Sequence, residues 1–554
     1  MKEQVPLIDC FAAPCRAGCP FGQDVPAYLR LTGEGKYLEA LHIITEKNPL
    51  PFITGTICSH NCMTKCTRCF YEGSVDIRSV KLAASSNAYK QLLDETKAPA
   101  KSGGKIDVVG GGPAGLAAAF FLARASRPVT LFEKRDSLGG IVRHVIPEFR
   151  ISGAAIDKDI AMVLAMGVDV RLNTEISDLE ELRAEGFERI IVAVGAWRPN
   201  KPALEKGETV DALEVLGQLK KSPESVSLGE NVVVIGGGNT AMDAARAAKR
   251  AAGVKRVSLV YRRTKRYMPA DPEELELAME EGIEFKELLA PKSIEGSVLI
   301  CEQMELGAPD ESGRRSPVPT GIFIEVPADT VISAVGNKVD SELFDTGAED
   351  ADTGAEDASA KDASAKDVYV IGDAASGPAT VAEAIASAAA CTVAITGVTM
   401  DKYAGLNVSG DIDTARDKKG ILNCDMEARE PERCLECPTI CELCVDVCPN
   451  RANISICIDG RPQIVHIDFM CNECGNCEVF CPYSSAPYLD KFTFYIHEED
   501  FDNSENAGFT ALADGTLRVR LDGATSDHRD GSELPTDIWR LIEVSQKKFG
   551  AWFN

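Results

Sequence analysis

The stretch IDVVGGGPAGLAAAFFLARASRPVTLFEKRDSL, residues 106 to 138, decides the fold because it contains every part of a nucleotide-binding βαβ unit. Its apolar pattern predicts a strand over 106–109, a helix over 114–125 and a second strand over 129–132. The turn between them follows G-x-G-x-x-G, whose glycines let the backbone approach a pyrophosphate beside the helix N-terminus. The second strand ends at Glu133, where a carboxylate can bind the hydroxyls of an adenosine ribose. The stretch therefore predicts a dinucleotide-binding domain.

The candidate binding residues of this unit lie in its turn and after its second strand: Gly110, Gly112, Pro113, Ala114, Gly115, Glu133 and Lys134. Gly139 and Gly140 follow at once and would let backbone approach the same ligand. Arg150 and Gly195, which ends the buried strand predicted over 190–194, complete the set for this domain.

A second unit with the same design begins at Asn231. Gly236, Gly238 and Ala241 occupy the positions of G-x-G-x-x-A, and Asn239 and Thr240 lie between them. The strand predicted over 257–260 ends in Tyr261 where a ribose-binding acid would be expected, and Arg262 and Arg263 follow. A guanidinium suits a 2′-phosphate, so NADPH is favoured over NADH. Two dinucleotide sites in one chain indicate two nucleotides, a bound flavin (FAD) and an exchanging nicotinamide.

The chain is expected to return to the first domain near Ala328 through the predicted strand DTVISAVG, residues 329–336. The repeats DTGAED and ASAKD within residues 345–367 have a composition typical of a flexible surface insertion. A strand predicted over 368–371 then delivers Gly372 and Asp373 to a turn before a helix that begins at Thr380. An aspartate there can bind the ribityl or pyrophosphate part of a flavin.

Composition limits the classes of partner. The chain has 554 residues, 45% hydrophobic content and a formal charge of −26, which argues against nucleic acid and anionic membranes. No apolar run approaches the roughly 18 residues of a membrane span, and the N-terminus lacks a signal pattern, so we expect a cytoplasmic protein. Of its 20 cysteines, 16 fall into two groups with metal-ligand spacing, which points to iron and sulfur.

The N-terminal group contains seven cysteines: Cys10, Cys15, Cys19, Cys58, Cys62, Cys66 and Cys69. One 4Fe-4S cluster needs four thiolates, so we expect one cluster here, or two if other ligands contribute. His60 is one such alternative ligand, and zinc is the competing interpretation of the group. The neighbouring nucleotide motif favours an electron-carrying cluster.

The C-terminal group contains nine cysteines, and its second half matches the C-x2-C-x2-C-x3-C-P run of a bacterial two-cluster ferredoxin. In such domains the fourth cysteine of each run ligates the other cluster. The expected sets are therefore Cys471, Cys474 and Cys477 with Cys448, and Cys437, Cys441 and Cys444 with Cys481. The spacing of the first run leaves open whether Cys434 or Cys437 is its first ligand. The remaining thiols are interpreted as packed side chains: Cys301, Cys391, Cys424 and Cys457.

The chain resembles the glutamate synthase small subunit family through GGGPAG, LFEK, LGG, GGGNTAMDAAR, VYRR and IGDAASGPATVAEAI. With ITGTICSHNCMTKCTR and the fused ferredoxin run, it is most similar to selenate reductase subunits of that family, and more distantly to dihydropyrimidine dehydrogenase. The resemblance implies FAD at the first motif and NAD(P)H at the second. Relatives open their iron–sulfur segment with a C-x2-C pair, whereas Leu7 stands three residues before Cys10 here. A second cluster in this segment would therefore need a replacement ligand, and Cys69 could serve.

The expected fold is α/β, with an NAD(P) domain inserted into a Rossmann-like FAD domain, between an N-terminal helical iron–sulfur domain and a C-terminal ferredoxin-like domain. The expected boundaries are 1–100 for the iron–sulfur domain, 101–230 and 328–410 for the FAD domain, 231–327 for the NAD(P)H domain, 411–489 for the two-cluster domain and 490–554 for a tail.

The predicted function is electron transfer between NAD(P)H, FAD and 4Fe-4S clusters within a hetero-oligomeric redox complex. Because the chain contains no substrate-reducing barrel, its partners would be other redox subunits, such as a molybdenum hydroxylase, a hydrogenase or ferredoxin. One alternative is a flavin-based electron-bifurcating subunit, and another is a non-enzymatic relay or scaffold. The intact glycines, Glu133 and Asp373 argue against the scaffold.

Overall fold

The computed structural model describes residues 13–70, 72–309, 315–339, 367–398, 412–419, 430–437, 441–458 and 460–549. The chain divides into two compact units, one of residues 1–43, 60–84 and 403–554, and the other of residues 44–59 and 85–402. Cys10, Cys424 and nearly all of the predicted insertion at 345–367 lie outside the described residues. Within the described part, no helix is both long enough and apolar enough to cross a membrane.

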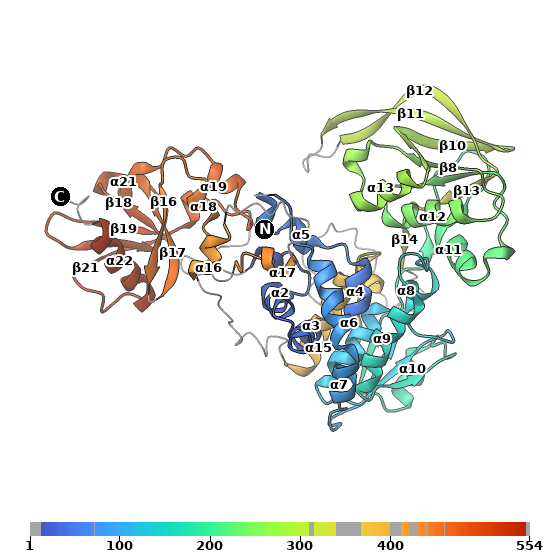
Figure 1. Ribbon diagram of the computed structural model, residues 1–554, viewed down its shortest axis with the longest axis horizontal. Coiled ribbons are helices and arrows are strands. Elements are labelled where there is room, and N and C mark those ends of the chain that lie inside the picture. The colour runs from blue at the N-terminus through green and yellow to red at the C-terminus, as the bar shows by residue number, and fades with distance from the viewer. Residues whose placement is uncertain are drawn as a thin grey trace. The chain divides into compact units, whose positions relative to one another are not determined.

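The first parallel sheet of the 44–59/85–402 unit contains the opening motif, and its strand order is β15-β4-β1-β2-β3. Figure 1 labels helices of the same domain, among them α7 (Pro113–Arg124) and α9 (Gly153–Ala165). The strands are β1 Ile106–Val109, β2 Val129–Phe132, β3 Asp169–Arg171, β4 Arg189–Val192 and β15 Val368–Val370. Val108 of β1 lies opposite Leu131 and Ile191 in the two neighbouring strands. The apolar runs thus form the buried centre of the sheet, as their pattern predicted.

Small side chains let the helices of this domain pack closely. Helix α7 (Pro113–Arg124) is buried along nearly its whole length, and its contact with α15 (Val381–Thr396) involves alanine-rich segments of both helices. Ala117, Ala118 and Ala119 have no exposed surface. The other helices around this sheet are α8 Gly140–His144, α9 Gly153–Ala165, α10 Leu179–Ala184 and α14 Asp373–Ser376.

The second parallel sheet has the order β6-β13-β7-β8-β9. Its strands are β6 Val210–Asp211, β7 Asn231–Ile235, β8 Arg256–Tyr261, β9 Glu284–Glu287 and β13 Thr330–Ser333, with helices α11 Ala212–Lys221, α12 Asn239–Arg250 and α13 Pro272–Glu280. β13 lies between β6 and β7, so the prediction that the chain has already returned to the first domain at this strand is wrong. Val331 and Ile332 pair with Val233 and Val234 instead.

The two crossings between these domains pair with each other. Strand β5 (Arg198–Pro199) leaves the first sheet, β14 (Asn337–Lys338) returns to it, and the two form a short antiparallel ladder. The second sheet is therefore inserted between β4 and β15 of the first, which confirms the predicted inserted architecture.

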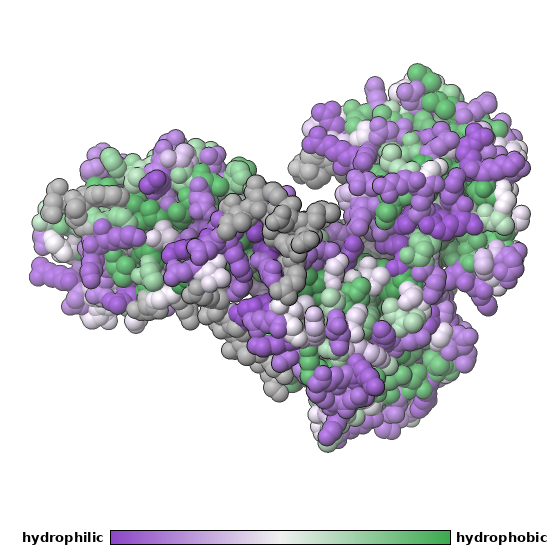
Figure 2. All heavy atoms as spheres, viewed as in Figure 1, coloured by the Kyte–Doolittle hydropathy of each residue, from purple (hydrophilic) through white to green (hydrophobic). Residues whose placement is uncertain are grey.

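An antiparallel sheet follows the second parallel sheet, with β10 Leu289–Glu295, β11 Val298–Pro309 and β12 Arg315–Pro327. Apolar side chains of β12 are exposed, with Ile322 at 55% and Phe323 at 50% of their full accessibility. Figure 2 shows hydrophobic residues at the surface over β11 and β12.

In the other unit, six strands form one sheet in the order β16-β17-β18-β19-β20-β21. They are β16 Asn453–Ile458, β17 Arg461–Ile467, β18 Thr493–Tyr495, β19 Gly508–Ala511, β20 Leu517–Leu521 and β21 Ala524–His528, and α22 (Thr536–Phe549) packs on them. His466 and Ile467 of β17 pair with Thr493 and Phe494 of β18. The predicted boundary at 489/490 therefore falls inside a continuous core rather than before a separate tail.

The N-terminal segment is helical, as predicted, with α1 Pro14–Ala17, α2 Val25–Gly33, α3 Tyr37–Lys47, α4 Pro51–Ile57, α5 Asn61–Thr64 and α6 Ile77–Glu95. The helix predicted over 25–44 is two helices, because the chain turns at Gly35 with a φ of +76°. The predicted linker at 88–104 begins later, since α6 continues to Glu95. The later part of this unit has short helices: α16 Ile412–Asp417, α17 Glu430–Arg433, α18 Leu443–Asp446, α19 Asn476–Val479, α20 Pro487–Asp490 and α21 Glu498–Asp502. Cys444 lies in α18 and Cys477 in α19.

One carboxylate in the first sheet is buried without a hydrogen bond in the described part of the chain. Asp107 of β1 has no exposed surface and lies opposite Thr130 and Ile190. Burial, with a smaller contribution from Glu185, raises the pKa of Asp107 from 3.8 to about 8. The carboxyl group is therefore protonated in the folded protein at neutral pH and ionised in the unfolded chain.

Replacement of this group by Asp107→Asn should change how stability depends on pH. Because the folded pKa is raised, the folded state binds the extra proton between about pH 4 and pH 8, and this proton's stabilising effect is lost as pH rises through that window. The stability of the parent protein relative to Asp107→Asn should fall by about 1.4 kcal/mol per pH unit there. Thermal unfolding midpoints of both proteins from pH 5 to pH 8 measure the difference. Parallel curves would contradict the assignment.

Candidate functional site

The first glycine turn brings the N-terminus of α7 against the end of β1. A Cβ atom at Gly115 would lie 1.9 Å from the carbonyl oxygen of Gly110, and one at Gly110 would lie 2.5 Å from the carbonyl oxygen of Ala193. Gly110 also has a φ of +109°. Pro113 occupies the first turn of α7, where it costs the helix no hydrogen bond. Glycine is therefore required at both positions for the backbone to turn this closely.

Glu133 lies beside this turn at the end of β2 and is held in one orientation. Its Oε2 accepts a hydrogen bond from Gly111 N–H at 2.9 Å, and its Oε1 accepts one from Arg135 N–H at 2.9 Å. The side chain is 7% exposed, so the carboxylate is positioned rather than free to rotate in solvent. Lys134 points elsewhere and forms a surface ion pair with Glu175.

Two glycine turns face each other across the first motif. A Cβ at Gly140 would lie 2.7 Å from Gly112 Cα, and Gly139 N–H donates to the carbonyl oxygen of Gly111 at 2.8 Å. These contacts place backbone atoms without side chains beside the α7 N-terminus, and such a surface lets a pyrophosphate approach. The residues present thus fit the diphosphate of FAD.

The distant segment at Gly372 completes this end of the domain. Gly372 has a φ of +61°, and a Cβ there would lie 2.7 Å from the Cβ of Ala114. Asp373 accepts a hydrogen bond from Ala379 N–H at 3.1 Å, and burial raises its pKa to about 6. Thr380 caps α15 through a reciprocal capping box with Glu383. Gly372 therefore lies against the first turn of α7, and Asp373 follows it in the chain.

Two predicted residues of the first domain have other roles in the structure. Arg150 forms ion pairs with Asp243 at 2.6 Å and Glu274 at 2.9 Å, so its guanidinium joins the first domain to the inserted one. Burial raises the pKa of Asp243 to about 6, and Arg150 opposes this shift. Gly195 has a φ of +79° and lies against the Trp197 ring.

The second glycine turn repeats the design of the first with more open space. A Cβ at Gly236 would lie 2.4 Å from the carbonyl oxygen of Ala334 and 3.1 Å from the Ala241 Cβ, whereas one at Gly238 would meet no atom within 4 Å. Gly236 therefore serves the turn. Gly238, which precedes Asn239 and Thr240 at the α12 N-terminus, leaves room for a ligand.

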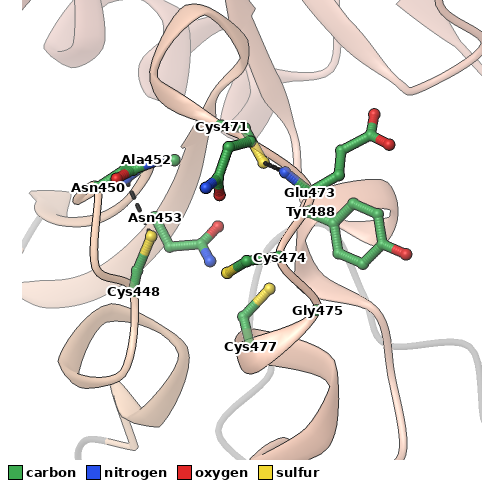
Figure 3. Close-up of a pocket in the computed structure, with 11 residues that line it drawn as sticks. Cys448, Asn450, Ala452, Asn453, Cys471, Glu473, Cys474, Gly475, Cys477 and Tyr488 are labelled. Carbon is green, nitrogen blue, oxygen red and sulfur yellow. Dashed lines mark hydrogen bonds between the residues drawn. The ribbon is translucent and has the colours of Figure 1, made fainter.

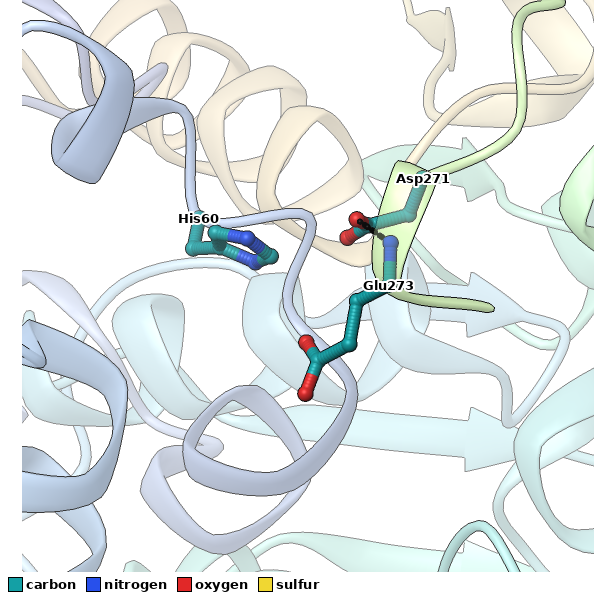
Figure 4. Close-up of side chains that lie close together, drawn as sticks. All are labelled: His60, Asp271 and Glu273. Carbon is teal, nitrogen blue, oxygen red and sulfur yellow. Dashed lines mark hydrogen bonds between the residues drawn. The ribbon is translucent and has the colours of Figure 1, made fainter. Parts of the chain in front are cut away.

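A neighbouring loop is fastened to this turn. Asn239 Oδ1 accepts a hydrogen bond from Asp271 N–H at 2.9 Å, and Asp271 caps α13 by accepting from Glu273 N–H at 3.1 Å (Figure 4). The Tyr261 ring lies against Gly237, and its hydroxyl donates to the carbonyl oxygen of Tyr267. Tyr261 therefore fills the place of the ribose-binding acid with a packed ring.

The two arginines after β8 differ in their surroundings. Arg262 is exposed, whereas Arg263 Nε donates to the carbonyl oxygen of Arg315 at 3.2 Å. Arg262 is therefore a cationic group available to a ligand directly after β8, and the exposed Lys265 and Arg266 follow it.

A thiol-lined pocket lies in the C-terminal part of the other unit (Figure 3). It is lined by the four thiols that the ferredoxin pattern grouped: Cys448, Cys471, Cys474 and Cys477. Backbone N–H groups of Ala452 and Glu473 donate to the Sγ atoms of Cys448 and Cys471, at 3.1 and 3.3 Å. Such bonds stabilise thiolates, so the pocket fits a 4Fe-4S cluster.

A second thiol-lined pocket in this unit joins the N-terminal segment to residues 434–437. Its four cysteines are Cys15, Cys66, Cys434 and Cys437. Burial raises the pKa of Cys434 to about 12, and burial and neighbouring thiols raise those of Cys15 and Cys437 well above their usual value. Sequence patterns had placed Cys437 with Cys441 and Cys444. The structure gives Cys437 thiol neighbours on both sides, Cys441 and the N-terminal thiols.

The other predicted ligands are placed in the following way. Cys19, Cys58 and Cys62 are partly exposed, Cys69 is exposed with its Sγ donating to the Met63 carbonyl oxygen, and His60 precedes α5 with a φ of +43°. Cys441 and Cys444 are buried, and Cys481 is partly exposed. Cys301 and Cys391 are buried thiols whose pKa burial raises to about 12, as expected for packed side chains. Cys457 is exposed, so its prediction as a packed thiol is wrong.

Sequence reasoning missed Arg433, which fastens the segment of Cys434 to the N-terminal segment. Its guanidinium donates to Glu72 Oε1 at 3.0 Å and to the carbonyl oxygens of Gly73 and Ser74 at 2.8 and 3.0 Å. The only sequence signal for this docking was indirect: the C-terminal group has nine cysteines, whereas two 4Fe-4S clusters need eight.

Comparison with known proteins agrees with this architecture. Residues 104–388, about half of the chain, match the pyridine nucleotide-disulphide oxidoreductase family, and residues 2–92 match dihydropyrimidine dehydrogenase domain II, 4Fe-4S cluster. The glutamate synthase [NADPH] small chain of Escherichia coli K12 is 30% identical over 59% of this chain and 75% of its own length. The chain belongs to the glutamate synthase small-chain family of pyridine nucleotide-disulphide oxidoreductases.

Other relatives are longer than this chain. YgfK of Escherichia coli K12, named as an oxidoreductase, is 40% identical over 94% of this chain and 52% of its own length. The NADPH-Fe(3+) oxidoreductase subunit beta of Geobacter sulfurreducens is 35% identical over 60% of this chain and 52% of its own length. The chain thus spans about half the length of these curated relatives.

Family membership confirms the kinds of cofactor and of enzyme. The chain has a pyridine nucleotide-disulphide oxidoreductase domain, which takes FAD and NAD(P)H, and a 4Fe-4S domain at its N-terminal end. The individual ligands remain assignments from sequence and geometry.

The two motifs should respond differently to the same substitution. Gly115→Ala would place a methyl group against the Gly110 carbonyl oxygen, so the turn must open and bound FAD should fall at least tenfold. Gly238→Ala meets no protein atom, so it should keep FAD but raise the KM for the nicotinamide nucleotide about tenfold. Flavin absorbance per protein and steady-state kinetics measure the two effects. Gly217→Ala, at an ordinary 3.4 Å contact, is the control; an FAD-replete Gly115→Ala protein would contradict the argument.

Proposed function

We propose that the chain transfers electrons between NAD(P)H and a partner protein through FAD and its 4Fe-4S clusters. The observation that carries the proposal is that one chain combines two dinucleotide turns with two pockets that are each lined by four thiols. FAD held at the first turn would supply hydride exchange with the nicotinamide and single-electron exchange with clusters, and would thus join two-electron to one-electron carriers. The name of the Geobacter relative, NADPH-Fe(3+) oxidoreductase subunit beta, agrees with this class.

The residues of the chain bind and orient in this proposal rather than act as nucleophiles. Glu133, held by two backbone N–H groups, accepts hydrogen bonds from the adenosine ribose of FAD. The bare backbone at Gly112 and Gly140 and the α7 N-terminus receive the pyrophosphate. Asp373, ordered by Ala379 N–H, orients the ribityl end of the same cofactor.

The inserted domain binds the exchanging nucleotide. Gly238 leaves space for the nucleotide's pyrophosphate at the α12 N-terminus. Tyr261 stands where a ribose-binding carboxylate would be expected, so no negative charge there repels a 2′-phosphate. Arg262, exposed at the end of β8, supplies a positive charge for that phosphate. These features favour NADPH over NADH.

The partner is a further redox subunit of a hetero-oligomeric complex. The formal charge of −26 favours a partner that presents basic groups at the contact. A molybdenum hydroxylase, a hydrogenase and a ferredoxin are the candidates, and the direction of electron flow depends on which of them is bound.

An anaerobic titration of the purified chain with NADPH tests the proposal. Flavin absorbance should bleach first, and the broad visible absorbance of the clusters should then decrease as electrons pass on. NADH serves as the comparison nucleotide. Stoichiometric FAD that neither nucleotide reduces would overturn the proposal and leave the chain as a scaffold.

The nucleotide preference should depend on Arg262. Arg262→Ala removes a charge-assisted contact with the 2′-phosphate, so the KM for NADPH should rise about tenfold while the KM for NADH stays within about twofold. Initial rates with an artificial one-electron acceptor measure both constants. Arg256→Ala, at the opposite end of β8, is the matched control and should change neither. Equal losses with both nucleotides would contradict the role.

A further inference from the structure

Cys434 and Cys437 lie in the C-terminal sequence group but line a pocket with two cysteines of the N-terminal group. The other lining residues include Pro14, Leu29, Val75 and Leu435, so the thiols meet in apolar surroundings. The pocket in Figure 3 has the same make-up, with four cysteines around one small cavity. Four thiolates are what a 4Fe-4S cluster requires.

The segment before Cys434 is fixed to the N-terminal segment by charge-assisted hydrogen bonds. Arg433 donates to Glu72 and to two adjacent carbonyl oxygens, and Glu430 Oε2 accepts from Asp76 N–H at 2.8 Å. In the opposite direction, Arg68 Nε donates to the carbonyl oxygen of Arg433 at 2.9 Å. The residues just before Cys434 are therefore held against residues 68–76.

Contacts at the thiols themselves continue this docking. Cys437 Sγ donates to Thr67 Oγ1 at 3.2 Å, next to Cys66 in the chain. Glu436 N–H donates to Cys434 Sγ at 3.5 Å, and Lys418 Nζ donates to the carbonyl oxygen of Cys434 at 3.2 Å. Positive and N–H groups beside the sulfur atoms favour thiolates that carry a cluster's negative charge.

We propose that Cys15, Cys66, Cys434 and Cys437 together hold one 4Fe-4S cluster, shared between the N-terminal segment and the C-terminal segment. Cys434, to which the ferredoxin pattern gave no cluster, is then a ligand. Cys437 is a ligand of the same shared cluster rather than of the cluster of Cys441 and Cys444. The site does not depend on the proposed electron path, because it concerns which thiols hold iron and not where the electrons go.

Loss of the same cluster from either side of the site is the test. Anaerobically purified Cys434→Ser and Cys15→Ser proteins should each lose about four irons and four sulfides per chain. The double variant should lose no more than either single variant, and the same EPR signal should vanish from all three after dithionite reduction. Cys457→Ser, at an exposed thiol of β16, is the control and should keep all iron.

The outcomes separate the shared site from two independent ones. Full iron in Cys434→Ser, or losses that add in the double variant, would overturn the proposal. Iron and an EPR signal retained at the pocket of Cys448, Cys471, Cys474 and Cys477 report folding, because that pocket lies in the same unit. If Cys434→Ser loses that signal too, Cys434→Asp replaces it: a carboxylate ligand should keep the iron and shift the EPR signal lost in Cys15→Ser. An unchanged signal would overturn the proposal.

Discussion

The close approach of helix α7 to strand β1 is the contact on which the flavin half of the molecule depends. At Gly115 there is no room for a Cβ beside the Gly110 carbonyl oxygen, so α7 can begin here only if this residue is glycine. The same geometry sets the α7 N-terminus beside Glu133 and opposite Gly140. Because α15 packs along α7, the distant turn at Gly372 reaches Ala114 as well. One backbone contact thus brings together segments that are separated by more than 250 residues.

The iron–sulfur unit depends on a different kind of contact. Its two sequence groups are separated by the whole of the nucleotide-binding domains, and charged side chains join them. Arg433 has three acceptors on residues 72–74, and burial of part of its guanidinium is offset by the carboxylates of Glu72 and Glu430, which raise its pKa. Hydrogen bonds of this kind fix direction as well as distance, so they can set the positions of thiols that a metal cluster requires.

Sequence alone predicted the elements whose signal is local. The strands of the opening unit end where the apolar runs end in the sequence. A buried parallel strand and a glycine turn are each encoded by a few consecutive residues, so both can be recognised locally. It failed where tertiary pairing decides: β13 joins the inserted sheet, and β18 extends the ferredoxin hairpin into a larger sheet. The sequence also assigned Arg150 to the cofactor site, and it held no local pattern for the ion pairs of Arg150 with Asp243 and Glu274.

The two thiol pockets differ in exposure, and this difference bears on what clusters in them could do. Cys15, Cys434 and Cys437 are less than 10% exposed, while Cys474 of the other pocket is open to solvent, near the exposed Val479. Reduction of a cluster adds negative charge, and a buried site disfavours that charge unless cations or N–H groups lie close. Arg68 and Lys418 are such cations beside the buried pocket. Electron exchange with another protein falls steeply with distance. A cluster in the exposed pocket would therefore be better placed for exchange with a partner, and one in the buried pocket for transfer within the chain.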